Sequence, residues 1–183
     1  MIALALALTL AGAPDLAQQV KARLTDAPVI TGSFEQSKQV KGFKRPLKSS
    51  GTYRVAKADG VTWKTEKPFA SELVVHAGDI TSTQNGVTVF KLDAKSEPGV
   101  RVITELLFSL LQGDLPALGA QFEQSGEVTE KDWRIELSPK AAALQKIFVK
   151  ITLKGDAAVR SVHLLEASGD ATLITLTPAT ATP

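Results

Sequence analysis

The sequence predicts an α+β fold that is mainly β, in which one long antiparallel sheet curls and helices pack against its concave face. Short segments with strand character, several of them carrying apolar residues at alternate positions, recur along most of the 183 residues. Hairpin signals such as Asn85-Gly86 join them, and such short connections make neighbouring strands antiparallel. Two helical segments interrupt the strands. A sheet with this many strands tends to curl, so its concave face is where the helices can bury their apolar sides.

The first 13 residues differ from the rest of the chain. They are almost entirely apolar and end in Ala11-Gly12-Ala13, a pattern of small residues typical of a signal-peptide cleavage site. The run is shorter than the roughly 20 apolar residues that span a bilayer. We therefore expect residues 1–13 to be a signal peptide and residues 14–183 to form a single exported domain. The alternative is a buried N-terminal helix.

A helix and about six strands are expected next. Leu16, Val20 and Leu24 recur every four residues and predict a helix over 14–27, which Pro28 ends. The expected strands are 29–39, 51–57, 61–66, 72–77, 80–83 and 87–92.

The pattern becomes helical after Pro98-Gly99. Residues 100–112 carry a broad apolar face, and Gly113 ends the helix. Asp114 is a candidate N-cap for a second short helix over 114–118. Strands return at 122–129, 133–137, 147–153, 159–166 and 172–176. The apolar face of 100–111 fits either ordinary core packing or a lid over an apolar cavity.

Composition and motifs argue against several functional classes. A net charge of +2 is too small for a nucleic-acid-binding surface. The absence of cysteine excludes disulfides, thiolate metal sites, a cysteine nucleophile and lipidation at a cysteine. His76 and His163 lie far apart without metal-ligand spacing, and no nucleophile elbow or phosphate loop occurs. We therefore expect no catalytic residues, no metal and no cofactor.

Basic residues cluster around Gly42 and Pro46, in what we expect to be a hairpin loop. The cluster comprises Lys38, Lys41, Lys44, Arg45 and Lys48. It fits either a solvated loop or a transient contact with anionic lipid headgroups or an acidic partner.

Several motifs resemble those of the periplasmic outer-membrane lipoprotein carrier family, the LolA-like proteins. Gly32-Ser33-Phe34-Glu35-Gln36 is similar to that family's Gly-x-Phe-x-Gln near the mature N-terminus. Gly51, Trp63 and Pro68 follow with the spacing of its Gly…Trp…Pro hairpin, and Leu137-Ser138-Pro139-Lys140 resembles its Leu-x-Pro-Lys. The order of elements agrees over nearly the whole mature chain.

The resemblance implies an incomplete antiparallel β-barrel closed by helices over an apolar cavity. It implies a periplasmic, chaperone-like transport protein that binds acylated lipoprotein or a related lipid-linked cargo. Its partners would be an inner-membrane release complex and an outer-membrane acceptor, and the chain would act as a soluble monomer. Because the chain has no cysteine, it resembles the unanchored carriers rather than the lipidated acceptors.

One departure from the family concerns an Arg-Pro pair in the strand before the tryptophan, which falls on Lys57-Ala58 here. In the family this arginine is associated with holding the helical lid. Lysine lacks its planar fork of donors, so Lys57 is a candidate lid contact with altered gating. Arg45-Pro46, ahead of Ser49-Ser50-Gly51, indicates a divergent branch of the family.

The candidate cavity residues are apolar positions of the expected strands and of the 100–112 helix. They are Phe34, Tyr53, Trp63, Leu73, Val75, Phe90, Leu106, Leu110, Phe148 and Ile151. Two alternatives stay open: a periplasmic scaffold that binds a protein partner without lipid, and an enzyme that acts on a lipid.

Overall fold

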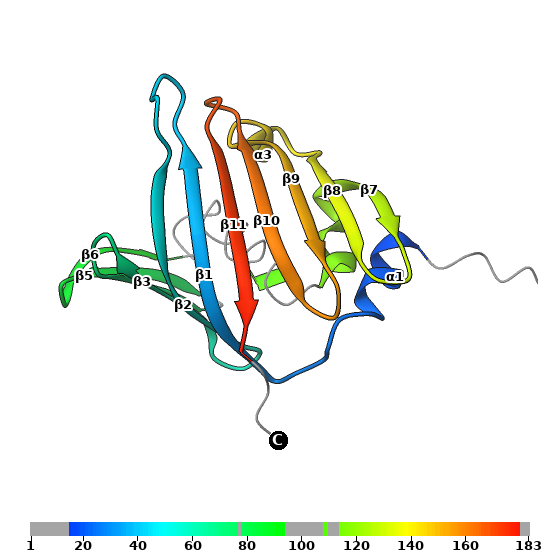
Figure 1. Cartoon of the computed structure of the whole chain (residues 1–183), viewed down its shortest axis with the longest axis horizontal. Helices are drawn as coiled ribbons and strands as arrows, with labels where there is room; N and C mark the ends of the chain where they lie inside the picture. Colours follow the sequence, from blue (N-terminus) through cyan, green and yellow to red (C-terminus); the bar gives the residue numbers. More distant parts are fainter. Residues whose placement is uncertain (1–14, 77, 94–107, 110–113, 180–183) are drawn as a thin grey trace, which may run out of the picture.

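The computed structural model describes residues 15–76, 78–93, 108–109 and 114–179. Within these residues, eleven strands form one sheet in the order β6-β5-β4-β3-β2-β1-β11-β10-β9-β8-β7 (Figure 1). The strands are β1 (Val29–Gln39), β2 (Leu47–Ala56), β3 (Gly60–Lys67), β4 (Ser71–Val75), β5 (Asp79–Gln84), β6 (Val87–Asp93), β7 (Phe122–Val128), β8 (Trp133–Pro139), β9 (Phe148–Gly155), β10 (Val159–Glu166) and β11 (Ala171–Pro178).

The sheet is antiparallel throughout its ladders and does not close into a barrel, because β6 and β7 stand at opposite ends of the strand order. The first six strands follow one another outward from β1. The last five form a second run, and β11 returns to pair with β1, from Gly32 opposite Pro178 to Gln39 opposite Ala171. The predicted fold class, a curled antiparallel sheet with few helices, is confirmed.

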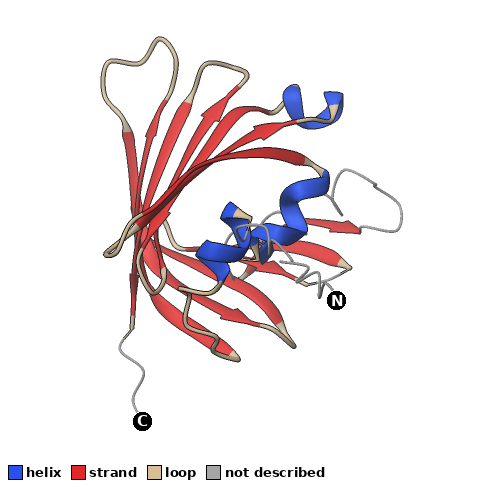
Figure 2. Ribbon diagram, turned by 90° about the vertical axis from the view of Figure 1, so that its right-hand side faces the viewer, coloured by secondary structure: helices blue, strands red, loops and turns tan. Residues whose placement is uncertain are grey.

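The sheet has two chemically different faces, because side chains alternate along each strand and directly opposed residues share a face. Phe34 is buried between exposed neighbours and lies opposite Gly51 on β2 and Leu176 on β11. These positions face the concave side, where Figure 2 shows the helices inside the curve of the sheet. The alternate positions, including Ser33 and Glu35, face the convex side.

The helices cover one part of the concave face. Helix α1 (Leu16–Lys21) and the 3₁₀ helix η1 (Leu115–Ala120) pack on each other and on β7. Their apolar side chains join those of β7, β8 and β9 in one core, which includes Val20, Leu118, Phe122 and Trp133. The β7–β9 part of the concave face is therefore filled by the protein's own side chains.

Two predictions about the helices need correction, and one helix was not predicted. The helix expected over 14–27 has only six residues, because the chain leaves the helical path after its C-cap, Ala22. Asp114 occupies the N-cap position of η1 but makes no capping hydrogen bond; its carboxylate pairs with Lys21 at 3.0 Å. A short helix, α3 (Ala142–Gln145), precedes β9 and was not expected.

Two predicted segments lie outside the described residues. These are the signal peptide, residues 1–13, and the helix over 100–112 apart from Phe108 and Ser109, which are helical. No helix in the described part of the chain is long and apolar enough to cross a membrane.

Gly51 allows β2 and β3 to come unusually close. A Cβ atom at this position would lie 1.9 Å from the carbonyl oxygen of Lys64 on β3, which no side chain tolerates. The ladder between the two strands has an irregularity here, between Ser50 and Gly51. The strand therefore bends at Gly51, which is consistent with curvature of the sheet at this point.

Candidate functional site

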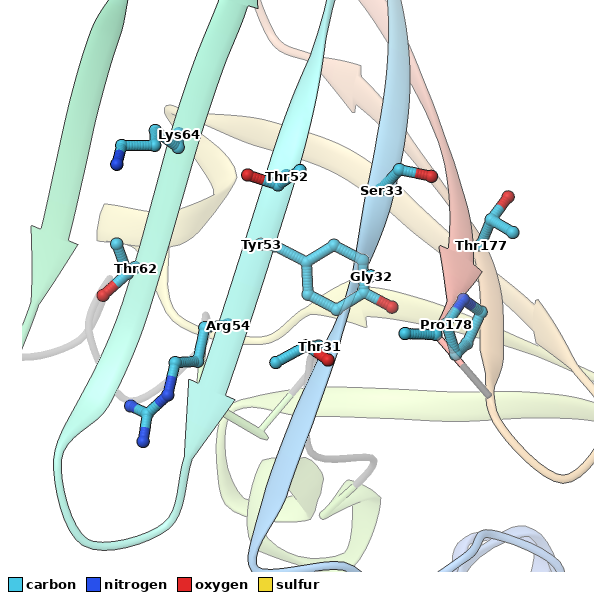
Figure 3. Close-up of a pocket in the computed structure, with 11 residues that line it drawn as sticks. Thr31, Gly32, Ser33, Thr52, Tyr53, Arg54, Thr62, Lys64, Thr177 and Pro178 are labelled. Atoms are coloured by element: carbon cyan, nitrogen blue, oxygen red, sulfur yellow. The ribbon is translucent and has the colours of Figure 1, made fainter. Parts of the chain in front are cut away.

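A shallow hollow of about 680 Å³ lies over β1, β2, β3 and the end of β11 (Figure 3). Its polar lining is Thr31, Ser33, Thr52, Arg54, Thr62, Lys64 and Thr177. These residues alternate with the buried apolar positions of the same strands, so the hollow belongs mainly to the convex face.

The charged side chains of this hollow are already engaged with neighbours on the surface. Arg54 pairs with Asp59 at 3.3 Å, and Lys64 pairs with Glu72 at 3.5 Å. Threonine hydroxyls make up most of the remaining polar lining. Such a shallow, open surface does not enclose a ligand, and its charged groups form no arrangement of acids and bases for catalysis.

The concave face opposite this hollow carries a cluster of aromatic rings. Phe34 and Trp63 stack with their centroids 3.9 Å apart and an angle of 27° between the rings. Tyr53 and Trp63 lie parallel within 24°, with centroids 6.0 Å apart. Burial raises the pKa of the Tyr53 hydroxyl, so this ring stays neutral in the apolar layer. The cluster forms an apolar layer across β1, β2 and β3.

The structure places the eight described cavity candidates on the concave face. Phe34, Tyr53, Val75 and Ile151 are buried, while Trp63, Leu73 and Phe148 are half-buried against the core. Phe90 is 42% exposed, because it lies on the edge strand β6. The other two candidates, Leu106 and Leu110, lie outside the described residues.

The candidates form two groups rather than one. Trp63, Leu73 and Phe90 lie in a cross-strand row, since Trp63 is opposite Leu73, and Leu73 and Phe90 are both opposite Ser82. Phe148 and Ile151 come from β9, which β10, β11, β1 and β2 separate from β3. The two groups share the concave face without direct strand pairing.

Burial changes between two adjacent rows of this face. Val55, Val61 and Val75 are opposed across β2, β3 and β4, and all three are buried. One row nearer the β1–β2 connection, Trp63 and Leu73 are only half-buried. The concave face over β3 and β4 therefore has a sealed row and, beside it, a partly accessible apolar row.

Two half-buried apolar residues of this face were missed by sequence reasoning. Leu164 on β10 and Ile174 on β11 point to the concave side beside Thr172 and Val162. Both have an apolar neighbour in sequence, Leu165 and Leu173, so the sequence pattern did not reveal which member of each pair faces inward. The register with β1 shows which member faces inward. Ile174 is opposite Gln36, which lies two residues from Phe34 and therefore on the same concave face.

A polar cluster lies on the same face at the end of the sheet where the β1–β2 and β10–β11 connections lie. Lys38 donates to Glu166 at 2.9 Å and lies 3.5 Å from Asp170, and Thr172 also contacts Glu166. Its hydrogen bond to Glu166 raises the pKa of Lys38. Lys38 is therefore held by acidic partners, unlike the rest of the predicted basic cluster.

Lys57, the candidate lid contact, lies in the turn after β2. Its ammonium group pairs with Asp26, which precedes β1, and its backbone N–H donates to Pro28 at 3.1 Å. The residues expected to form the lid lie outside the described part of the chain, so Lys57 remains a predicted lid contact.

The two histidines do not come together. His76 follows β4 and its Nδ1 lies 2.5 Å from the carbonyl oxygen of Asp59, whereas His163 faces the convex side of β10. No cluster of metal-ligating side chains occurs among the described residues.

Comparison with known proteins gives a family match and several solved structures. Residues 11–182 match the family model described as outer membrane lipoprotein carrier protein LolA-like. No curated protein matches the chain in sequence.

Three solved structures have a similar arrangement of elements at low sequence identity. A LolA superfamily protein from Nitrosomonas europaea is 8% identical with a TM-score of 0.48, covering 92% of this chain and 93% of that one. A domain described as an outer membrane lipoprotein-sorting protein, from Vibrio parahaemolyticus, is 12% identical with a TM-score of 0.47, covering 92% of each chain. A DUF1329 family protein from Desulfovibrio piger is 11% identical with a TM-score of 0.49, covering 88% of each.

Proposed function

Because the chain belongs to the LolA-like family of outer membrane lipoprotein carrier proteins, we propose that it carries acylated cargo on the concave face of its sheet. The family consists of carrier-type binding proteins that work in the periplasm. In our proposal, residues 14–183 are the carrier domain that remains after a signal peptide, residues 1–13, is removed. The cargo is a lipoprotein or a related lipid-linked molecule, taken from an inner-membrane release complex and passed to an outer-membrane acceptor.

The half-buried apolar row of the concave face carries this proposal. Trp63 and Leu73 pack against the buried row on one side and keep part of their apolar surface accessible. An acyl chain that covers this surface removes it from water, and each buried methylene contributes about 0.8 kcal/mol. A chain of many methylenes can therefore leave a membrane for such a site without a large loss of free energy.

Native mass spectrometry tests the proposal directly. The chain from Pro14 onward is purified from a periplasmic extract without detergent. We expect an adduct whose mass identifies a lipid or an acylated peptide. A clean apo mass, together with no uptake of added fatty-acyl probes, would contradict a carrier role.

A comparison of two variants tests whether Lys57 contacts a lid. Because its described partner is Asp26, Lys57→Ala and Asp26→Ala both remove the ion pair. If Lys57 also holds a lid, Lys57→Ala changes the release rate of a bound acyl probe and Asp26→Ala does not. Equal release rates in the two variants would contradict a lid contact and leave the ion pair with Asp26 as the role of Lys57.

A second candidate function, a scaffold without lipid, is favoured by one observation. Edge strand β6 exposes the side chains of Val87 and Val89, and an edge strand offers backbone groups to a partner strand. A scaffold role predicts the apo mass in the experiment above and a protein partner that Val89→Lys releases.

A further inference from the structure

The β1–β2 hairpin ends in an exposed apolar tip, residues 40–48, which we call the hairpin tip. Phe43 is 62% exposed and Leu47 is 58% exposed. In Figure 1 this hairpin stands beside the β10–β11 hairpin at one end of the sheet. Two large apolar side chains held in water on one protruding hairpin are costly unless they meet a partner.

The hairpin tip is an ordered turn. The N–H of Phe43 donates to the carbonyl of Val40 at 3.0 Å, and Gly42 has the positive φ of 88° that the third position of a type II turn requires. The Gln39 side-chain amide donates to the Phe43 carbonyl at 2.6 Å, and the Lys41 N–H donates to the Asp170 carboxylate at 2.9 Å. The ordered backbone of this turn therefore holds the Phe43 side chain in an exposed position.

The hairpin tip is also strongly basic. Lys41, Lys44, Arg45 and Lys48 lie within eight residues, and no acidic residue occurs between positions 36 and 58. None of these four side chains has an ion-pair partner among the described residues. Their charge is available to an external partner, whereas Lys38 is already paired with Glu166.

We propose that the hairpin tip docks the protein on an anionic phospholipid bilayer. Phe43 and Leu47 enter the boundary between headgroups and acyl chains, and the four cations lie over the headgroups. Apolar side chains at the tip of a basic hairpin fit a lipid surface, which offers both an apolar layer and negative charge. An acidic protein would bury Phe43 only if it had an apolar pocket beside its carboxylates, whereas an anionic bilayer has both features over its whole surface.

This docking goes beyond the carrier role, since it concerns the tip of the β1–β2 hairpin and not the half-buried apolar row proposed to hold the cargo. It orients the molecule with this end of the sheet toward the membrane.

Vesicle cosedimentation at low salt tests the proposal with purified protein from Pro14 onward. The vesicles are phosphatidylcholine alone or phosphatidylcholine with phosphatidylglycerol. We expect binding only when phosphatidylglycerol is present, and weaker binding as salt is raised. Lys41→Ser/Lys44→Ser/Arg45→Ser should lower the affinity roughly 100-fold, and Phe43→Ser should lower it about tenfold.

Two control variants match these changes on distant surfaces. Lys64→Ser/Lys131→Ser/Lys154→Ser removes the same charge from exposed positions outside the hairpin tip, and Val89→Ser removes an exposed apolar side chain from β6. Both should bind as the wild type does. Circular dichroism confirms folding of every variant, which we expect because all the substituted side chains are exposed.

Three outcomes would overturn the docking proposal. They are equal binding by the Lys41/Lys44/Arg45 variant and its charge-matched control, equal binding to both kinds of vesicle, and binding to polyglutamate but not to vesicles. Leu73→Trp, which is designed to block cargo, should keep full vesicle binding. Failure of the docking proposal and failure of the carrier proposal are therefore distinguishable.

Discussion

Phe34 and Trp63 stack face to face although the strand between them, β2, separates β1 from β3. The contact is possible because Gly51, opposite Phe34, has no side chain to stand between the rings. The backbone of β3 approaches Gly51 closely at Lys64. One glycine therefore permits both the aromatic contact and the bend of the sheet.

Gly51→Ala should strongly destabilise the protein. The added methyl would collide with the Lys64 carbonyl, so we expect a loss of about 3 kcal/mol or more in the free energy of unfolding. Gly78→Ala is the matched control, because a Cβ atom there meets no atom within 4 Å. It should change stability by less than about 0.5 kcal/mol in urea denaturation. Equal effects of the two substitutions would contradict the close approach at Gly51.

Trp63 should report cargo binding through its fluorescence. Its ring is half-buried on the concave face, whereas Trp133 is buried and donates to the Asp156 carbonyl at 2.8 Å. Addition of a fatty-acyl probe should shift the emission to shorter wavelength in Trp133→Phe, which keeps only Trp63. Trp63→Phe should show no shift. A shift in Trp63→Phe alone would place the cargo elsewhere.

Leu73→Trp should block uptake of acyl chains. The larger side chain fills the half-buried row beside Trp63, so we expect at least a tenfold loss of probe affinity, on the order of 1.4 kcal/mol. Leu173→Trp makes the same substitution on the convex face of β11, where the side chain is exposed. It should bind the probe as the wild type does, in a titration followed by native mass spectrometry. Loss of affinity in both variants would mean that the effect is not local.

Ionised Asp156 should add to the free energy of unfolding at neutral pH, and this contribution should be lost in acid. A hydrogen bond from Arg160, at 2.9 Å, is the main reason why the pKa of this carboxyl lies below its usual 3.8. Because the pKa is lower in the folded state, the contribution is present above pH 3.8 and is lost as pH falls through the folded pKa. The pair is largely exposed, so Asp156→Asn should cost at most about 1 kcal/mol near neutral pH.

The pH dependence provides the check on this assignment. The difference in unfolding free energy between the wild type and Asp156→Asn should shrink as the pH is lowered below 3.8. Asn keeps an oxygen that accepts from Arg160 and from the Ala158 N–H, so the difference reports the charge. A difference that stays constant down to the lowest pH would exclude the ion pair as its source.

The strands were predictable where apolar alternation and turn signals agree. The bounds predicted for Val29–Gln39 and Val159–Glu166 match the structure at both ends. Strand β2 begins four residues before its predicted start, because Leu47–Ser50 pair with β1 although this segment has no apolar alternation to mark it as a strand. Helix α3 follows Ala141 at its N-cap, which carries no capping side chain and gave no start signal.

The sequence identified apolar residues that lie on the concave face, but it did not show how exposed each of them is. Phe90 was among the apolar candidates of the expected strands, but only the strand order puts it on an edge, where neighbours cover one side alone. In the sequence Lys38 is grouped with the basic residues that follow it, but in the structure it is paired with Glu166, which lies 128 positions away. Both differences depend on contacts between residues far apart in the sequence.

The pairing of β1 with β11 has a consequence for the timing of folding. This ladder joins the two halves of the sheet in its middle, with Gly32 opposite Pro178. The aromatic cluster on β1 to β3 therefore gains its neighbours on β11 only after nearly the whole chain has been synthesised. Pairing over such a sequence distance is slow because a long loop must close first. For a chain that we propose is exported, this delay favours passage through a translocation channel in the unfolded state, with assembly of the sheet on the far side of the membrane.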